Sequence, residues 1–440
     1  MSGCQTFRKH LQCIALPLAL PGKSQEAISY FPGQNRALMH QNPSAAISFD
    51  LSLEGFSAQI FSSIDQASFH WKAIQPADNR FLSLDYLRAV ELSPPEGVTP
   101  YYLVFFKNER PAGLAYLQLI DFRADESLQF DKPEGLLNSL KHSFREKALG
   151  LLRFRLLHVG NLLLTGPRGF YFLPELTGEK EAHSLLRAAL PLVRKSLQDQ
   201  LGQSIQAYVV KDIPVESPLS DDWKEEGYSE HCFLPNMVLT LEPEWKTFDD
   251  YLGRLQSKYR VRARRAFRLL DGVERRELQT AEIAAYSADI HRLYSEIASS
   301  VEFNIATLHP NYFSSLKTQL GDTFHLMGYF LEGELVGFFT TIENGRELEA
   351  HFIGFEKGVN LTYQLYLNML FDMVRMGIEK GCSHISFART AMEIKSSVGA
   401  VSEQLKCYIR HTSPLTNAIV APLVSRLQPA EEWEARHPFK

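Results

Sequence analysis

Cysteine is scarce in this sequence, and the few cysteines are widely spaced. The 440 residues include 5 cysteines, an odd number, and no two of them form a Cys-x-x-Cys pair. A disulfide framework or a cysteine-ligated zinc site needs paired, closely spaced cysteines, so the sequence argues against both. It favours a reducing compartment, and we expect the protein to be cytoplasmic.

Long hydrophobic runs are also missing. No apolar stretch approaches the ~18 residues that a membrane-spanning helix needs, so we expect no membrane span. Residues 11–20 are largely apolar and follow Arg8 and Lys9, which loosely resembles a secretory signal. Pro17 interrupts that stretch and no clean Ala-x-Ala cleavage site follows it, so we expect residues 1–45 to form a poorly ordered N-terminal extension.

The familiar catalytic motifs are absent as well. The sequence contains no GxSxG, no HExxH, no GxxxxGK[ST] and no GxGxxG, and no two of its 14 histidines stand four residues apart. These absences weaken the case for an elbow-type serine hydrolase, a metallohydrolase, a P-loop ATPase or a Rossmann dehydrogenase. We expect no metal ion, and the function has to be inferred from the architecture.

What is present is an ordinary globular composition with a slight acidic excess. Hydrophobic residues make up 45% and charged residues 22%, and 46 Lys and Arg against 51 Asp and Glu give a net charge of −5. This balance excludes a generally basic nucleic-acid coat but leaves room for one local basic face. The length exceeds that of one ordinary domain, so we expect two.

The C-terminal half carries the clearest pattern, which predicts three strands, a helix and a fourth strand. Asn344-Gly345 is a strong hairpin signal, because both residues tolerate positive φ. Gly381 is placed to end the helix. The expected strands are 324–331, 335–342, 347–355 and 383–388, the helix is 361–380, and a further strand at 405–411 and a helix at 414–427 follow.

The N-terminal half repeats this order more loosely. Its expected strands are 101–107, 112–122, 154–165, 169–173 and 204–211, with a helix at 179–200. Either the chain contains an internal duplication, or a mixed protein has produced similar strings by chance. The expected fold class is α/β (α+β), with two domains at 46–240 and 241–440, each a mixed, mainly antiparallel sheet flanked by helices.

A basic segment lies between the two repeats. From Arg254 to Arg276 there are nine Lys or Arg against two acids. We expect an amphipathic helix at 250–270, because at about 100° per residue its apolar and basic side chains fall on opposite faces. The apolar face would carry Leu252, Leu255, Tyr259, Ala263, Ala266 and Leu270, and the basic face Lys258, Arg262, Arg265 and Arg268.

The basic face has two interpretations. It suits a phosphorylated ligand, a nucleotide or an RNA backbone. Alternatively, it is a solvated helix whose charges meet acids elsewhere, for example Asp249 and Asp250.

Several short strings resemble one family. They are Lys258-Tyr259-Arg260-x-Arg262, Leu293-Tyr294, His309-Pro310-x-Tyr312-Phe313, the segment from Arg389 to Lys395, and Phe81-Leu82-Ser83. Together they resemble GNAT-superfamily acyltransferases of the FemAB-like branch, which have two tandem GNAT domains and are related to the Fem peptidoglycan aminoacyltransferases. The resemblance covers roughly residues 50–425. It implies N-acyl transfer from acyl-CoA to an amine of a small molecule, sugar or peptide.

The resemblance also implies where the acyl donor binds. In GNAT folds two strands splay apart, so that free backbone groups meet the pantetheine, and a loop with the next helix N-terminus receives the pyrophosphate. Here that loop is 354–360, although it lacks the full glycine pattern and Glu356 would repel phosphate. The first repeat offers only Gly178 with Glu179 beside it. The expected cofactor-binding residues are Gly354, Lys357, Gly358 and Asn360.

Acyl transfer to an amine needs a base, oxyanion donors and an acid for the leaving thiolate. Glu349 and His351 are the best base candidates, because they are two apart on one strand and so share a face. Tyr363 or Tyr366 would be a phenolic acid. Each of these residues has an ordinary packing or pairing role as its alternative.

Substrate-binding residues are expected near the last strand of the second repeat and on the basic helix. Residues 396–399 are expected to form a loop, and an internal Arg389–Glu393 ion pair is the alternative to substrate binding by those two side chains. The expected set is Lys258, Arg262, Arg265, Arg389, Glu393 and Lys395.

Two further functions stay open. The basic helix favours Fem-like transfer of an aminoacyl group from tRNA, but residues 276–324 leave no room for the long helical hairpin typical of Fem enzymes. The incomplete phosphate loop favours a non-catalytic protein that uses a degenerate GNAT fold to bind a metabolite or a partner protein.

Overall fold

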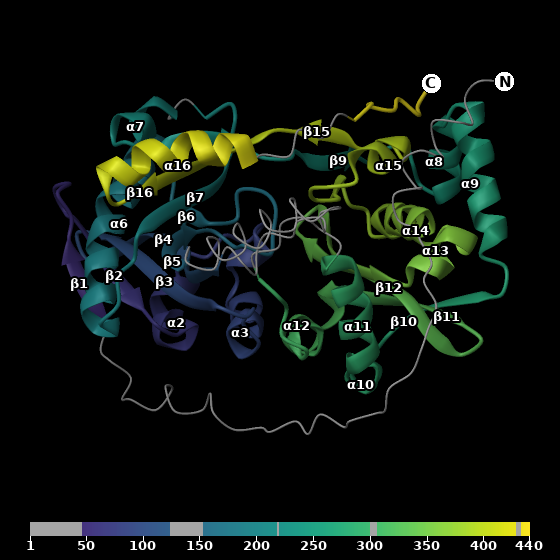
Figure 1. Ribbon diagram of the computed structural model, residues 1–440, viewed down its shortest axis with the longest axis horizontal. Helices are drawn as coiled ribbons and strands as arrows, with labels where there is room; N and C mark the ends of the chain where they lie inside the picture. Colours follow the sequence, from purple (N-terminus) through teal and green to yellow (C-terminus); the bar gives the residue numbers. More distant parts are fainter. Residues whose placement is uncertain (1–45, 124–152, 218–219, 300–305, 428–432) are drawn as a thin grey trace, which may run out of the picture. The chain divides into compact units, whose positions relative to one another are not determined.

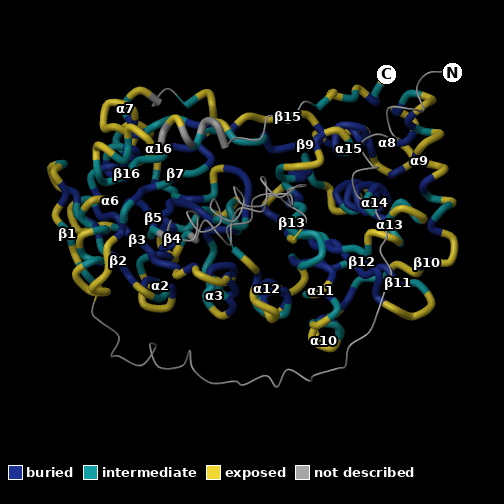
Figure 2. The backbone as a smooth tube through the Cα atoms, in the orientation of Figure 1, coloured by how far each residue is buried: buried dark blue, intermediate teal, exposed yellow. Residues whose placement is uncertain are grey.

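Two mixed β-sheets flanked by helices form the described part of the chain (Figure 1). A computed structural model describes residues 46–123, 153–217, 220–299, 306–427 and 433–440. The expected N-terminal extension at 1–45 lies outside these residues. Figure 2 shows the strands as mostly buried and the outer faces of the helices as exposed.

The second sheet contains the predicted three-stranded meander. Its strand order is β10-β11-β12-β13-β14-β9-β15. Strands β11 (Phe324–Leu331), β12 (Glu334–Asn344) and β13 (Glu347–Phe355) are antiparallel neighbours, and β14 (His384–Ser386) runs parallel to β13. The expected strand order is therefore confirmed, with β14 shorter than 383–388.

The single helix expected at 361–380 is wrong. The segment forms α13 (Lys357–Tyr363) and α14 (Leu365–Glu379), and Gln364 between them has a left-handed backbone with φ 51°. The Asn360 side chain stabilises the break, because its Oδ1 accepts the backbone N–H of Tyr366 at 2.9 Å. A residue with positive φ cannot continue a right-handed helix, so the axis changes there.

The first sheet repeats the same order. Its path is β1-β2-β3-β4-β5-β7-β16-β8, with β6 beside β4. The predicted helix is confirmed as α6 (Glu179–Leu201), and β5 and β7 on either side of it in sequence are parallel. Strand β5 ends before the predicted residue 165, because Gly160 turns the chain with φ 116°. The bounds are β1 (Ile47–Asp50), β2 (Phe56–Phe61), β3 (Val98–Lys107), β4 (Arg110–Arg123), β5 (Arg153–Val159), β6 (Phe170–Phe172) and β7 (Ala207–Pro214).

The two sheets exchange strands. Strand β16 (Leu405–His411) lies in the first sheet between β7 and β8 (Ser229–Cys232), and the confirmed helix α16 (Pro414–Leu427) follows it. Strand β9 (Asn236–Thr240) lies in the second sheet, between β14 and β15 (Val401–Glu403). Each sheet therefore contains a strand from the other half of the chain, β16 in the first sheet and β9 in the second.

Apolar packing also joins the two halves. Helices α2 (Ile64–Lys72) and α3 (Leu84–Leu92) come from the first half, and α11 (Ser287–Ala298) and α12 (Tyr312–Leu320) from the second. Figure 1 shows them in a row, and α3 packs directly on α12. Their apolar faces form one buried cluster that contains residues from both halves, such as Tyr86 and Phe313.

The basic segment forms two helices, so the continuous helix expected at 250–270 is wrong. Helix α8 (Phe248–Arg254) ends at Leu255, whose extended backbone breaks the axis, and α9 (Ser257–Leu269) follows. Strand β10 (Val273–Glu277) and helix α10 (Thr280–Ala285) come next. The predicted apolar face is confirmed, because its six members are all buried: Leu252, Leu255, Tyr259, Ala263, Ala266 and Leu270.

Candidate active site

Strand β13 has an edge that its neighbour covers only in part. Strand β14 pairs with Glu347, Leu348 and Glu349 alone. From there to Phe355, β13 has β12 on one side and no strand of the described residues on the other. Because the two parallel strands separate after three residue pairs, backbone N–H and C=O groups beyond Glu349 are left without a ladder partner on that side. An extended ligand has backbone to pair with at this edge.

A β-bulge lies in the same stretch of β13. The register against β12 passes from Thr341↔Ala350 to Phe339↔Ile353, which leaves one extra residue in β13. The Thr340 hydroxyl fills the gap, because it accepts the N–H of Phe352 at 2.9 Å and donates to its carbonyl oxygen at 3.1 Å. Bulges re-aim side chains and are frequent beside active sites.

Glu349 is a buried carboxyl group next to the open edge. It is 1% exposed, and its Oε2 has no hydrogen-bond partner among the described residues. Burial raises its pKa well above the usual range, and the neighbouring Glu347 carboxylate raises it further, against the opposing charge of Arg168. This raised pKa favours the protonated form of Glu349, which has a proton to donate.

Arg168 comes from the first half and contacts this acidic pair. It lies in the loop between β5 and β6, forms an ion pair with Glu347, and has its Nη2 3.8 Å from Oε2 of Glu349. Glu347 also accepts a hydrogen bond from His384 Nε2 at 2.8 Å. Sequence reasoning missed Arg168, although its place in a Gly-Pro-Arg-Gly turn after a buried strand is a signal of a positioned cation.

A chain of polar side chains crosses between the halves beside Glu349. The Tyr312 hydroxyl and His351 Nε2 are 2.8 Å apart, Tyr312 is hydrogen-bonded to Tyr86, and Asn161 Nδ2 donates to the Tyr86 hydroxyl at 3.1 Å. Burial lowers the pKa of His351 to about 3, so the ring is neutral. Burial raises the pKa of the Tyr86 hydroxyl, and an ionised Glu349 raises it further.

Lys395 is a second buried ionisable group at the site. It is 5% exposed, and its ammonium donates to the carbonyl oxygens of Arg389 at 2.6 Å and Ala388 at 3.3 Å. Burial lowers its pKa to about 7, and an ionised Glu349 carboxylate opposes the shift. Ala388, Thr390 and Ala391 have φ of 57°, 67° and 48°, so Lys395 holds a loop whose non-glycine backbone is strained.

Arg389 and Glu393 do not form the internal ion pair that was the alternative for them. Arg389 pairs with Asp212 of β7 and donates to the carbonyl oxygen of Leu234 at 2.7 Å. Glu393 is exposed and pairs with Arg436. The loop expected at 396–399 is wrong for its first two residues, because α15 (Met392–Ser397) continues through them.

The expected cofactor loop is built largely from internal contacts. Gly354 lies against α11, where a Cβ atom would be 2.7 Å from the backbone of Leu293 and Tyr294. The Lys357 backbone N–H donates to Glu296 Oε1 at 3.2 Å, while Arg292 pairs with Glu356 at 3.2 Å. Asn360 supports the α13–α14 break as described above, and Gly358 faces open space.

Two tyrosines follow the loop and pack with the second sheet. Tyr366 stacks on Phe355 at 5.9 Å between ring centroids, and burial raises its pKa. Tyr363 packs against the same hydrophobic cluster. Among the described residues, no hydrogen bond or ion pair joins Tyr363 to Glu349 or His351.

The basic residues of α9 stand apart from this cluster. Lys258, Arg262 and Arg265 are exposed. None of them has a carboxylate oxygen of the described residues within 4 Å, although the Glu393 charge acts on Arg262. Asp250, suggested as a partner, instead accepts hydrogen bonds from Thr247 at the start of α8.

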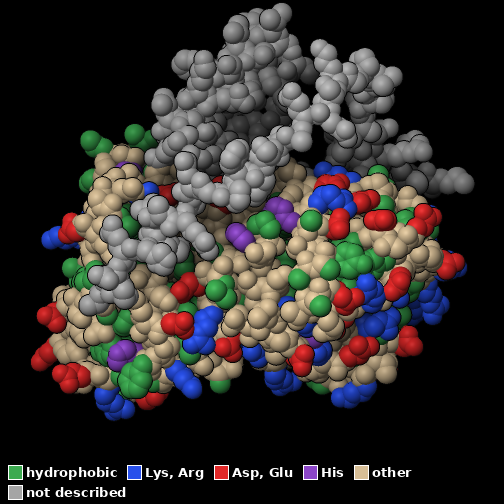
Figure 3. Space-filling model, turned by 90° about the horizontal axis from the view of Figure 1, so that it is seen from below, with side chains coloured by type: hydrophobic (Ala, Val, Ile, Leu, Met, Phe, Trp, Pro, Cys, Tyr) green, Lys and Arg blue, Asp and Glu red, His purple; other side chains and the backbone are tan. Residues whose placement is uncertain are grey.

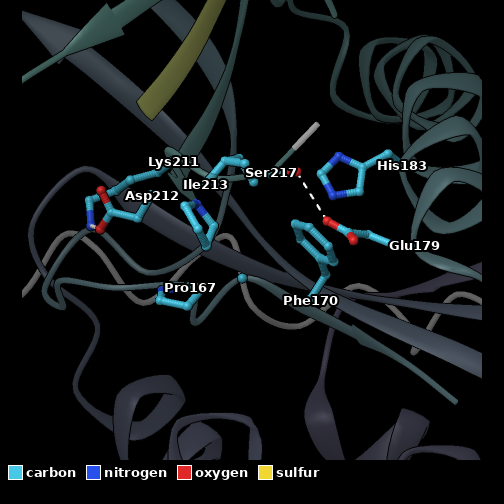
Figure 4. A pocket seen from close by; sticks show the side chains of 10 residues that line it. Pro167, Phe170, Glu179, His183, Lys211, Asp212, Ile213 and Ser217 are labelled. Atoms are coloured by element: carbon cyan, nitrogen blue, oxygen red, sulfur yellow. Dashed lines mark hydrogen bonds and ion pairs between the residues drawn. The ribbon is translucent and has the colours of Figure 1, made fainter. Parts of the chain in front are cut away.

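The first sheet has a cavity at the matching place, between the end of β7 and the start of α6 (Figure 4). Its volume is about 190 Å³. Glu179 accepts a hydrogen bond from Ser217 at 3.0 Å, and His183 Nδ1 accepts one from Trp223 at 3.0 Å. Glu179 and His183, two side chains that line the cavity, therefore already have hydrogen-bond partners.

The described segments contain neither a membrane-spanning helix nor a metal-binding cluster. No helix there is both long enough and apolar enough to cross a bilayer. In the same segments, no group of three or more His, Cys, Asp or Glu side chains is arranged to hold a metal ion.

No family model and no curated protein matches the sequence. Solved structures do match. FemX has a TM-score of 0.48 and 11% identity, covering 82% of this chain and 98% of its own. A tandem GNAT protein from the clavulanic acid biosynthesis pathway has a TM-score of 0.46 and 12% identity, covering 81% and 99%. L-PGS from Bacillus licheniformis has a TM-score of 0.44 and 10% identity, covering 83% and 97%. The chain is thus similar to FemX-like and tandem GNAT proteins in the arrangement of its sheets and helices, and at these identities the similarity carries nothing about substrate.

Proposed function

We propose that this chain is a GNAT-type N-acyltransferase that moves an acyl group from acyl-CoA to an amine of a small molecule, sugar or peptide. The observation that supports this most directly is the open edge of β13 beside the buried Glu349, whose pKa is raised by burial. An extended thioester needs strand-like backbone groups to pair with, and its leaving thiolate needs an acid. The free backbone groups and the acid both lie on β13, between Glu349 and Phe355.

The open edge of β13 holds the pantetheine arm in this proposal. The backbone groups after Glu349 pair with its two amides, and Lys357 and Gly358, at the start of α13, meet the phosphates. The Glu356 carboxylate is partly neutralised by Arg292, which reduces its repulsion of a phosphate. Gly358 leaves space there, because nothing lies within 4 Å of the place where its Cβ would be.

In this proposal Glu349 is the acid and Lys395 is the base. The acceptor nitrogen forms a bond to the thioester carbonyl carbon, and the carbon–sulfur bond then breaks. Glu349 gives its proton to the departing thiolate. A neutral Lys395 uses two hydrogens for the carbonyl oxygens of Ala388 and Arg389 and keeps a lone pair, which takes the proton that the acceptor amine loses. His351, with its low pKa, positions Tyr312 and is a weak base.

The remaining expected substrate residues take other parts in this proposal. Arg389 and Glu393 fix the loop that Lys395 also holds. Lys258, Arg262 and Arg265 lie on α9 and form a separate surface, which is considered below.

Thermal unfolding of the purified chain with free CoA and a panel of CoA thioesters tests donor binding. A thioester at ~100 times its dissociation constant is expected to raise the free energy of unfolding by roughly 2.7 kcal/mol. No rise with any thioester or with CoA would reject the acyl-CoA donor.

Glu349→Gln separates binding from chemistry. The variant keeps the shape of the Glu349 side chain but removes its acidic proton, so the thioester-induced stabilisation should persist while turnover falls by about 100-fold or more. Glu334→Gln, the same change at an exposed carboxyl group at the start of β12, is the matched control. Unchanged turnover in Glu349→Gln would remove Glu349 from the mechanism. Thioester binding without turnover against a panel of amines would favour the non-catalytic alternative.

A further inference from the structure

Helix α9 presents a face of cations without acids. The helix contains Lys258 and five arginines and no Asp or Glu, in a chain whose net charge is −5. At about 100° per residue the exposed cations cover an arc of about 160°, opposite the buried Tyr259 and Ala263. The exposed cations are Lys258, Arg262, Arg264, Arg265 and Arg268.

These cations lack ion-pair partners among the described residues. No described carboxylate oxygen lies within 4 Å of Lys258, Arg264 or Arg268, whereas Arg275 and Arg276 on the next strand each pair with an acid. Much of the surface in Figure 3, by contrast, mixes Lys and Arg with Asp and Glu. Like charges set side by side repel one another, so the face suits a partner that brings many negative charges.

Two exposed aliphatic side chains accompany the cations. Val261 on α9 is 64% exposed, and Leu361 on α13 is 66% exposed. Helix α13 packs against α9, and Figure 1 shows the two helices near each other at one edge. Tyr259, by contrast, is 8% exposed, and no aromatic side chain of α9 or α13 is classed as exposed.

The apolar residues distinguish between two polyanions. Proteins that hold single-stranded nucleic acid combine cations with exposed aromatic rings on which the bases stack. Helices that lie on a bilayer combine Lys and Arg with apolar side chains that enter the headgroup region. The α9–α13 face has the second combination.

We propose that the face formed by the exposed cations of α9 together with Val261 and Leu361 binds the surface of an anionic lipid bilayer. The arginines lie against the lipid phosphates, and Val261 and Leu361 enter between the headgroups. The proposal concerns peripheral attachment and does not depend on the acyl-transfer reaction.

Vesicle co-flotation of the full chain tests the proposal. We expect binding to phosphatidylcholine vesicles that contain phosphatidylglycerol, little binding to phosphatidylcholine alone, and loss of binding at high salt. The triple variant Arg264→Gln, Arg265→Gln, Arg268→Gln should lower the partition coefficient by about 100-fold. The matched control neutralises three exposed lysines on α2 and α6, Lys72→Gln, Lys180→Gln and Lys195→Gln, and should bind as the parent chain does.

A second variant tests the aliphatic pair. Val261→Ser with Leu361→Ser keeps every charge, and it should weaken binding to anionic vesicles while leaving its salt dependence unchanged. Equal binding by the triple variant and the parent chain would overturn the proposal. So would tight, salt-sensitive binding to a single-stranded RNA or to tRNA with no binding to anionic vesicles, which would assign the face to nucleic acid. Circular dichroism and thermal unfolding check that each variant is folded.

Discussion

The Tyr312 hydroxyl lies 2.8 Å from Nε2 of His351, and this contact joins the start of α12 to the bulge in β13. Both rings are held by their surroundings, since Tyr312 is 0% exposed and burial keeps His351 neutral. The same hydroxyl is hydrogen-bonded to Tyr86 of the first half. One phenol therefore connects the strand of the proposed donor site with the other half of the chain.

Tyr312→Phe should lower the free energy of unfolding by about 1–3 kcal/mol. The change leaves His351 Nε2 and the buried Tyr86 hydroxyl with one partner fewer, and an unsatisfied buried polar group costs about this much. Urea denaturation measures the difference. Tyr363→Phe is the control, because the Tyr363 hydroxyl makes no hydrogen bond to the described residues, and its effect should stay below about 0.5 kcal/mol.

Arg168→Gln should destabilise the chain by about 3 kcal/mol or more, because it leaves the partly buried Glu347 carboxylate without its cation. Adding Glu347→Gln should restore part of this loss, since the double variant no longer buries an uncompensated charge. Denaturant titrations of the two single variants and the double variant form a thermodynamic cycle. Additive losses would mean that the two side chains do not interact.

Lys395 should make stability depend on pH between about 7 and 10.5, its pKa in the folded chain and its ordinary value. In this window the unfolded chain binds a proton that the folded chain lacks. The free energy of unfolding therefore rises with pH, by up to about 1.4 kcal/mol per unit, and this gain is lost as the pH falls through about 7.

Lys395→Met should remove that slope. Urea denaturation at several pH values from 7 to 9.5 compares the parent chain, Lys395→Met and the exposed-site control Lys180→Met. Parallel curves for the parent chain and Lys395→Met would show that Lys395 does not titrate differently in the two states.

Gln364→Gly should stabilise the chain by about 0.5–1 kcal/mol. Gln364 has φ 51° and ψ 46°, a left-handed conformation that costs a residue with a Cβ roughly 1 kcal/mol and glycine much less. Thermal or urea unfolding measures the change. Gln364→Val should act in the opposite direction, and equal effects of the two substitutions would indicate that the backbone at this residue is not left-handed.

The strands could be predicted because their signals are local. Strands β11 and β13 were predicted at their observed bounds from apolar runs that end at turn residues such as Gly333 and Gly345. The α13–α14 break was missed, because glutamine is a good helix former and nothing adjacent to Gln364 signals positive φ. The candidate site is harder to predict from the sequence, since Arg168 and Glu347 are 179 residues apart and their contact depends on the packing of the two halves. The catalytic roles of Glu349, His351 and Tyr363 stay predictions.

The exchange of strands between the sheets has a consequence for synthesis of the chain. Strand β16 separates β7 from β8, so the first sheet has a gap until residues 405–411 have left the ribosome. Until then, the first half of the nascent chain has two unpaired strand edges, at β7 and at β8, and unpaired edges are sites of aggregation. Truncations that end before residue 405 should be poorly soluble, and release of the full chain should be followed by a slow closing step that depends on contacts very distant in sequence.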